Sequence, residues 1–258
     1  MQRPPDRRSP QVLFSRPTNE WINRVGQKHK QFAELQLSDE EKTALKNRVE
    51  AEFVYSTLRL EGIDVSRGQV ARLAAASPDD LSAVNKSDLP ASALLRAIRK
   101  VEDLAETEGR SARLTPELLV SLNEAGFRNT PGDAARPLKP TPAEHLGAAV
   151  ESACRWYAAE SFEELNPVEQ ASIVLLRLAE IQPFEQANLA TALAAASLLT
   201  LRSQLPPVII RPENDAELLN ALEESSRMNT RPTVELIARE IEKTLDEMID
   251  QGRSKKQK

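Results

Sequence analysis

The chain has 258 residues, a net charge of −5 and a single cysteine, Cys154. The acidic balance argues against a general nucleic-acid binder, which needs a basic face, and one cysteine excludes a disulfide framework or a cysteine-rich metal site. Its two histidines, His29 and His145, lie too far apart in sequence to suggest a histidine-rich metal site. No apolar run reaches the ~20 residues that a membrane span needs. We therefore expect a cytoplasmic protein that binds no metal, nucleic acid or membrane.

Helical patterns follow an Arg- and Pro-rich leader, residues 1–16, that we expect to be disordered. Ser38 followed by Glu41 forms a capping box, which satisfies amide groups at the start of a helix. This helix is predicted to end near Gly62, because glycine suits the position after a helix. Further helices are predicted to begin near residues 65, 90, 115 and 143, and a last one spans residues 233–249.

The most apolar stretch, residues 166–201, predicts two buried helices joined by a short loop. Asn166 is a suitable N-cap, with Pro167 in the first helical position and Glu169 two residues later. Both helices are apolar on nearly all sides, which is typical of the central helices of a core. The loop, residues 182–188, joins a Pro and an aromatic to several polar groups, which indicates a former or present site.

The absence of a series of strand patterns predicts an all-α fold, a helical bundle around the central helix pair. We expect an N-terminal helical extension over residues 17–110, a core over 111–250 and a short disordered tail over 251–258. Residues 128–142 are rich in Pro and contain a Pro-Gly-Asp turn signal, and a small β-hairpin is left open there.

Three motifs, in this order, resemble the Fic (Fic/DOC) family, whose best-known members are AMP transferases. The loop carries Pro183, Phe184 and Asn188 of the family signature H-P-F-x-[D/E]-G-N-[G/K]-R-x-x-R. Residues 57–62, TLRLEG, fit the family's inhibitory pattern [S/T]-x-x-x-E-[G/N], through Thr57, Glu61 and Gly62. Residues 131–136, PGDAAR, are similar to a loosened form of its flap segment. The resemblance covers residues 38–249 and implies AMP transfer from ATP with a divalent metal ion.

The chemical groups of the signature are replaced. Gln182 stands where the family has the histidine that deprotonates the target hydroxyl, and an amide is no general base at neutral pH. Gln186 stands where the family has an acidic metal ligand, and a neutral amide is a poor ligand for a hard cation. The phosphate-binding glycines and arginines are also replaced, by Ala187, Leu189, Ala190 and Leu193.

We expect these positions to have structural roles. Gln182 is interpreted as a helix-terminal amide, Pro183 and Phe184 as the end of the first central helix, and Asn188 as a cap of the second. Ala187 should disfavour a left-handed backbone. In the family the inhibitory glutamate pairs with the last arginine, but Leu193 offers no such partner. Glu61 is therefore predicted to cap the second central helix, whose start favours an anion.

Three functions remain open. The leading one is a degenerate Fic-fold protein that has lost AMP transfer, needs no cofactor, and serves a binding, regulatory or remnant role. Its protein partner is unidentified, and self-association is left open. The alternative is an active nucleotidyl- or phosphoryl-transferase that uses ATP and Mg²⁺ at an unconventional site. The third is an unrelated helical adaptor, which would not place residues 57–62 beside the loop.

Overall fold

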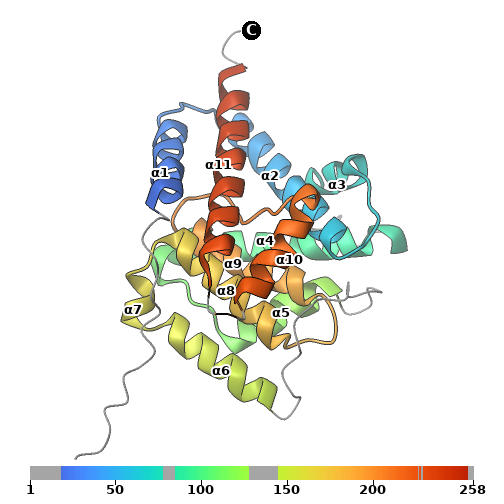
Figure 1. Ribbon diagram of the computed structural model, residues 1–258. Helices are drawn as coiled ribbons and strands as arrows, with labels where there is room; N and C mark the ends of the chain where they lie inside the picture. Colours follow the sequence, from blue (N-terminus) through green and yellow to red (C-terminus); the bar gives the residue numbers. More distant parts are fainter. Residues whose placement is uncertain (1–18, 78–84, 128–144, 226, 228, 255–258) are drawn as a thin grey trace, which may run out of the picture.

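The computed structural model describes residues 19–77, 85–127, 145–225, 227 and 229–254, and in these residues it contains helices and no strand (Figure 1). The all-α prediction is therefore confirmed. The α-helices are α1 (Asn19–Ala33), α2 (Asp39–Leu60), α3 (Arg67–Ala74), α4 (Leu89–Glu108), α5 (Pro116–Phe127), α6 (Leu146–Tyr157), α7 (Glu160–Glu163), α8 (Pro167–Ile181), α9 (Asn188–Leu201), α10 (Asp215–Ser225) and α11 (Arg231–Ser254). Short 3₁₀ turns cover Lys86–Asp88, Gly109–Ser111 and Pro212–Asn214. None of these helices is both long and apolar enough to span a membrane.

Helices α8 and α9 form the central pair that the sequence predicts. Asn166 starts α8, because its Oδ1 accepts a hydrogen bond of 2.9 Å from Val168 N and its own N–H donates to Glu169. Every residue of α9 from Leu189 to Thr200 is buried. A helix that is buried on all sides must be surrounded by other elements, and this one lies at the centre of the molecule (Figure 1).

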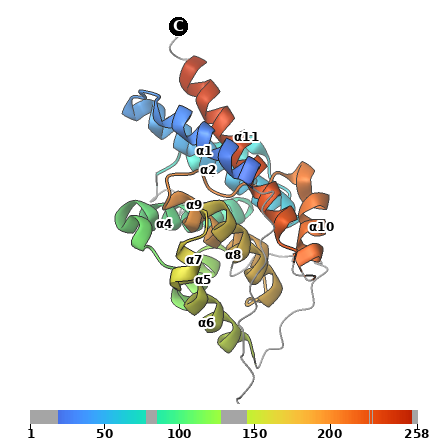
Figure 2. The same cartoon turned by 60° about the vertical axis from the view of Figure 1, so that its left-hand side comes forward.

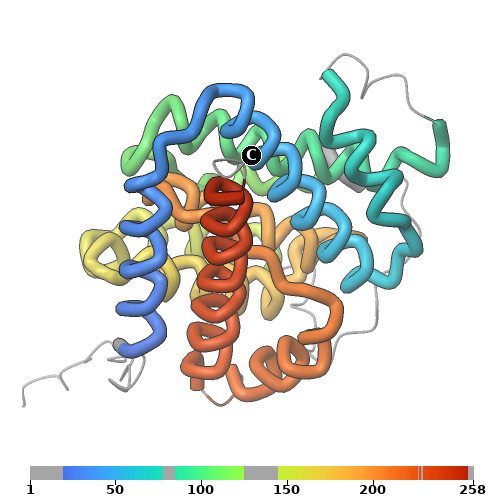
Figure 3. Tube along the Cα trace, turned by 90° about the horizontal axis from the view of Figure 1, so that it is seen from above, coloured from blue at the N-terminus to red at the C-terminus, as the bar shows by residue number. Residues whose placement is uncertain are grey.

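The other helices enclose this pair. Helices α4 and α5 pack against α9, whereas α6, α10 and α11 pack against α8. Seen from above, α11 runs between α1 and α2 (Figure 3), and α1 crosses over α2 in the second view (Figure 2). Arg24 of α1 joins this layer to α11 through a hydrogen bond and an ion pair to Glu242, each of 3.0 Å. One continuous hydrophobic core runs through the predicted extension and the predicted core.

The predicted disordered tail is wrong for its first four residues. Helix α11 continues to Ser254, although the sequence pattern ends it at Ile249. Gly252 explains the extension, because a side chain there would meet Leu35 and Leu37 at 3.0 and 3.1 Å, so the glycine lets both leucines pack on the helix. The leader, the hairpin and the flap segment lie outside the described residues.

Candidate functional site

The loop between α8 and α9 contains two residues in a left-handed conformation. Gln182 ends α8 with φ 48° and ψ 62°, and its N–H donates to Leu178 O at 2.9 Å. Ala187 precedes α9 with φ 57° and ψ 35°. Alanine disfavours this conformation, yet the loop keeps the backbone that suits glycine, at a cost of about 1–2 kcal/mol. Neighbouring contacts must supply that energy.

Asn188 supplies two of these contacts. Its Oδ1 accepts from Phe184 N at 2.9 Å, and its Nδ2 donates to Phe184 O at 2.7 Å. The predicted capping role is therefore wrong, because Asn188 is itself the first residue of α9 and its side chain reaches back across the loop. The two hydrogen bonds close the turn into a fixed shape.

A second clamp comes from Asn123 of α5. Its Nδ2 donates to the carbonyl of Gln186 at 3.0 Å and to Thr191 Oγ1 at 3.1 Å, so one amide ties both the loop and the first turn of α9. The sequence motif does not include Asn123, which lies 63 residues before Gln186. Nothing in its local pattern distinguishes it from an ordinary polar helix residue.

The start of α9 is capped by a residue from α2. Glu61 follows α2, is 4% exposed, and its Oε1 accepts a hydrogen bond of 2.8 Å from Ala190 N. Gly62, with φ 77°, ends the segment as predicted. The capping role expected for Glu61 is confirmed, and residues 57–62 lie beside the loop as the resemblance requires. The hydroxyl of Thr57, by contrast with the Glu61 carboxylate, is buried and has no hydrogen-bond partner among the described residues.

Apolar side chains occupy the positions where the signature has its cations. Ala190 and Leu193 are fully buried, and Leu189 is 3% exposed. On the loop, Glu185 and Gln186 are exposed, whereas Gln182, Pro183 and Phe184 are half-buried. The described residues contain no cluster of three or more His, Cys, Asp or Glu that could hold a metal ion. Glu61 accepts an N–H at the start of α9, and Ala190 and Leu193 stand where the signature has its arginines, so these two positions offer no cation to neutralise phosphate.

Cys154 and His145, which could serve as a relocated nucleophile and a relocated base, both belong to the α6 region. Cys154 is buried on α6, and burial raises the pKa of its thiol to about 11, which keeps it protonated at neutral pH. His145 is exposed at the start of α6. Burial favours a packing role for Cys154, and exposure favours a surface role for His145.

The chain matches no protein-family model. It is similar to two curated proteins that are named protein adenylyltransferases. It is 30% identical to the Nematostella vectensis protein over 124 residues, which are 48% of this chain and 29% of that protein. It is 24% identical to the Caenorhabditis briggsae protein over 254 residues, which are 92% of this chain and 48% of that one. The chain thus spans less than half the length of these relatives.

A solved structure is similar to this protein over most of the chain. The Fic domain-containing signalling protein of Bacteroides thetaiotaomicron superposes with a TM-score of 0.74 at 21% identity, over 91% of this chain and 98% of that one. At this identity the likeness concerns the fold.

Proposed function

We propose that the chain is a member of the Fic family that has lost AMP transfer and uses the retained fold to bind or regulate a protein partner. One observation carries this proposal. The carboxylate of Glu61 accepts the N–H of Ala190 at the start of α9, and the neighbouring cation positions hold buried Ala190 and Leu193.

The electrostatics of this helix end oppose a nucleotide. A phosphate binds at a helix start when backbone N–H groups point at it and nearby cations neutralise it. Here an anionic side chain of the protein takes one of those N–H groups. A triphosphate would have to displace Glu61 and would find neither signature arginine, so the exchange would be unfavourable.

The chemistry of the loop also opposes transfer. The amide of Gln182 has no pKa in the range that a general base needs. Gln186 is exposed and neutral, and Mg²⁺ prefers carboxylate and phosphate oxygens. We infer that the role lies in the cytosol, where the single buried thiol of Cys154 stays reduced.

Calorimetry with ATP and Mg²⁺ tests the proposal on the wild-type chain and on Glu61→Gly. We expect no binding to either, because the variant removes the competing carboxylate without restoring a cation. Micromolar binding to the wild type would overturn the proposal. Binding to the variant alone would show that Glu61, and not the missing arginines, excludes the nucleotide.

Activity is tested with labelled ATP, Mg²⁺ or Mn²⁺ and cell lysate. We expect no more label on protein with the wild type than with Gln182→Ala. Transfer above that control would favour the alternative, an active transferase with an unconventional site on the same fold.

A further inference from the structure

A cavity of about 660 Å³ lies at the end of α9 remote from the loop. It is lined by residues of α2, α4 and α11 and by the segment around α9's last turn, Leu201 to Pro207. Because α9 rises ~1.5 Å per residue, its two ends are roughly 20 Å apart. The volume falls within the range of small-molecule pockets, about 300–1,000 Å³. The cavity shares no lining residue with the degenerate loop.

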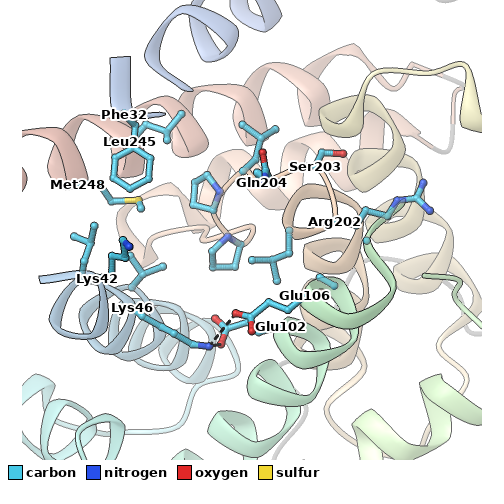
Figure 4. Close-up of a pocket in the computed structure, with 18 of the residues that line it drawn as sticks. Phe32, Lys42, Lys46, Glu102, Glu106, Arg202, Ser203, Gln204, Leu245 and Met248 are labelled. Atoms are coloured by element: carbon cyan, nitrogen blue, oxygen red, sulfur yellow. Dashed lines mark hydrogen bonds and ion pairs between the residues drawn. The ribbon is translucent and has the colours of Figure 1, made fainter. Parts of the chain in front are cut away.

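The lining of this cavity is divided into an apolar part and a polar part (Figure 4). Phe32, Leu245 and Met248 form one side, and Pro206 and Pro207 add apolar surface to the lining. Lys46, Glu102 and Glu106 gather on the opposite side. A molecule that fits both parts has an apolar body and one polar end.

Glu102 is the deeply placed member of the polar group. It is 6% exposed, and its Oε2 is buried and accepts no hydrogen bond among the described residues, although Lys46 Nζ lies 3.2 Å away. The Lys46 side chain is 41% exposed, and its Nζ also lies 3.4 Å from Oε1 of Glu106, whose side chain is 70% exposed. The polar group therefore extends from solvent to a buried carboxyl, and Lys46 joins its exposed and buried members.

A second buried carboxyl lies behind Glu102. Glu50 is 1% exposed and is held by Arg99, whose Nε donates to Glu50 Oε2 at 2.8 Å. Burial, and next the charge of Glu50, raise the pKa of Glu102 to about 8, although Lys46 acts in the opposite direction. At neutral pH the Glu102 carboxyl is thus largely protonated, and in this form it is a hydrogen-bond donor.

The remaining charges around the cavity are mainly positive. Lys42 pairs with exposed Asp39, and Arg110 is exposed and forms no ion pair in the described part of the chain. Arg202 also lines the cavity, but its guanidinium binds Glu163 and Ala112 O and points away (Figure 4). Glu106 is the one exposed carboxylate of the lining, so the entrance favours an anion over a cation.

We propose that this cavity binds a small amphipathic carboxylate, with its apolar body against Phe32, Leu245 and Met248 and its head group accepting hydrogen bonds from Lys46 and Glu102. The Lys46 ammonium supplies charge and the Glu102 carboxyl supplies a proton donor. An alcohol of the same size would gain only the apolar contacts, and an ammonium would be repelled by Lys42, Lys46 and Arg110. This proposal holds whether or not the protein has lost AMP transfer.

Calorimetry of the full chain at pH 7 with decanoate, decanol and decylammonium tests the ligand class. These probes share one apolar chain, so their differences report the head group. We expect one decanoate per chain, bound at least tenfold more tightly than either other probe. Lys46→Met should weaken decanoate binding tenfold or more and leave decanol unchanged. Absence of decanoate binding, or decylammonium binding as tightly, would overturn the proposal.

The role of Glu102 is tested by Glu102→Gln, because the amide still donates a hydrogen bond but does not ionise. Carboxylates of Glu102, Glu106 and Glu50 raise the pKa of Lys46 despite its burial, so it stays charged at pH 9. We expect wild-type binding of decanoate to fall at least fivefold between pH 7 and pH 9, and the variant to stay within twofold. An equal loss of decanoate binding in the wild type and in Glu102→Gln would contradict the role assigned to Glu102.

The location is tested by filling the cavity. Ala105 lines it on α4, and Ala105→Phe should abolish decanoate binding. Ala158→Phe adds the same volume at an exposed position after α6 and should leave binding unchanged. Thermal unfolding of both variants verifies that they fold; if Ala105→Phe does not, the loss expected in Lys46→Met still decides the question. Unchanged binding in a folded Ala105→Phe would place the ligand elsewhere.

Discussion

The carboxylate of Glu61 accepts a hydrogen bond of 2.8 Å from the N–H of Ala190, a residue 129 positions further along the chain. Helix α2 and helix α9 are thereby joined at the point where the family signature has its phosphate-binding groups. An anion at a helix start is stabilised by the helix dipole, typically by about 0.3–1 kcal/mol and by up to about 2 kcal/mol when partly buried. The contact therefore stabilises the fold whether or not a nucleotide binds.

Removing this carboxylate should destabilise the fold. Glu61→Ala leaves the buried N–H of Ala190 unsatisfied, so we expect the free energy of unfolding to fall by about 2 kcal/mol. Glu61→Gln retains an acceptor without the charge and should cost about 1 kcal/mol. Urea unfolding followed by circular dichroism measures both.

Glu185→Ala is the matched control, because Glu185 is exposed on the adjacent loop. It should change stability by less than about 0.5 kcal/mol. A loss for Glu61→Ala no larger than that of this control would mean that the hydrogen bond contributes nothing.

The central helices could be predicted because their signals are local. Capping boxes at Ser38 and Asn166 mark two helix starts, and the apolar runs on both sides of residues 182–188 mark the buried pair. The order of the motifs also placed Glu61 near α9, because the resemblance brings those segments together. These predictions needed no knowledge of how distant helices pack.

The loop's detailed contacts could not be predicted, because they depend on packing. Asn123 reaches the loop only because α5 lies against α9. Asn188 could cap a helix or clasp a turn, and only its position as the first residue of α9 decides between them. Ala187 is left-handed because the surrounding contacts outweigh its own preference, and local propensity cannot report that.

Relief of this backbone strain provides the next prediction. Ala187→Gly should stabilise the protein by about 1 kcal/mol, since glycine adopts φ 57° without a Cβ clash. Ala196→Gly, in the middle of α9, is the matched control and should destabilise by about 1 kcal/mol or more. Midpoints of urea unfolding compare the two. Loss of stability in both variants would show that the loop tolerates alanine without strain.

Restoring a cation should be costly on its own. Leu193 is fully buried on α9, so Leu193→Arg places a charge in the core and should lower stability by about 3–5 kcal/mol. If the new guanidinium pairs with Glu61, the double variant with Glu61→Gln should lose more than the sum of the single losses. A double-mutant cycle from urea unfolding measures this coupling. Additive losses would show that the two positions no longer face each other.

The buried carboxyl of Glu102 should make stability depend on pH. The pKa of Glu102 is raised to about 8 by burial and by Glu50, well above its ordinary value of 4.5. Between these two pH values the folded state therefore binds more protons than the unfolded state. The contribution of Glu102 to the free energy of unfolding is greatest below about pH 4.5 and is lost as the pH rises toward 8.

Glu102→Gln removes this titration and keeps the shape of the side chain. Relative to the wild type, the variant should gain on the order of 2–4 kcal/mol between pH 5 and pH 9. Other groups near Glu102, namely Glu50, Arg99, Lys46 and Glu106, are common to both proteins, so their contributions largely cancel in the difference. Urea unfolding at pH 5, 7 and 9 gives this difference directly. A difference that stays constant over this range would mean that Glu102 is ionised in the folded protein throughout, with Lys46 outweighing the effect of its burial.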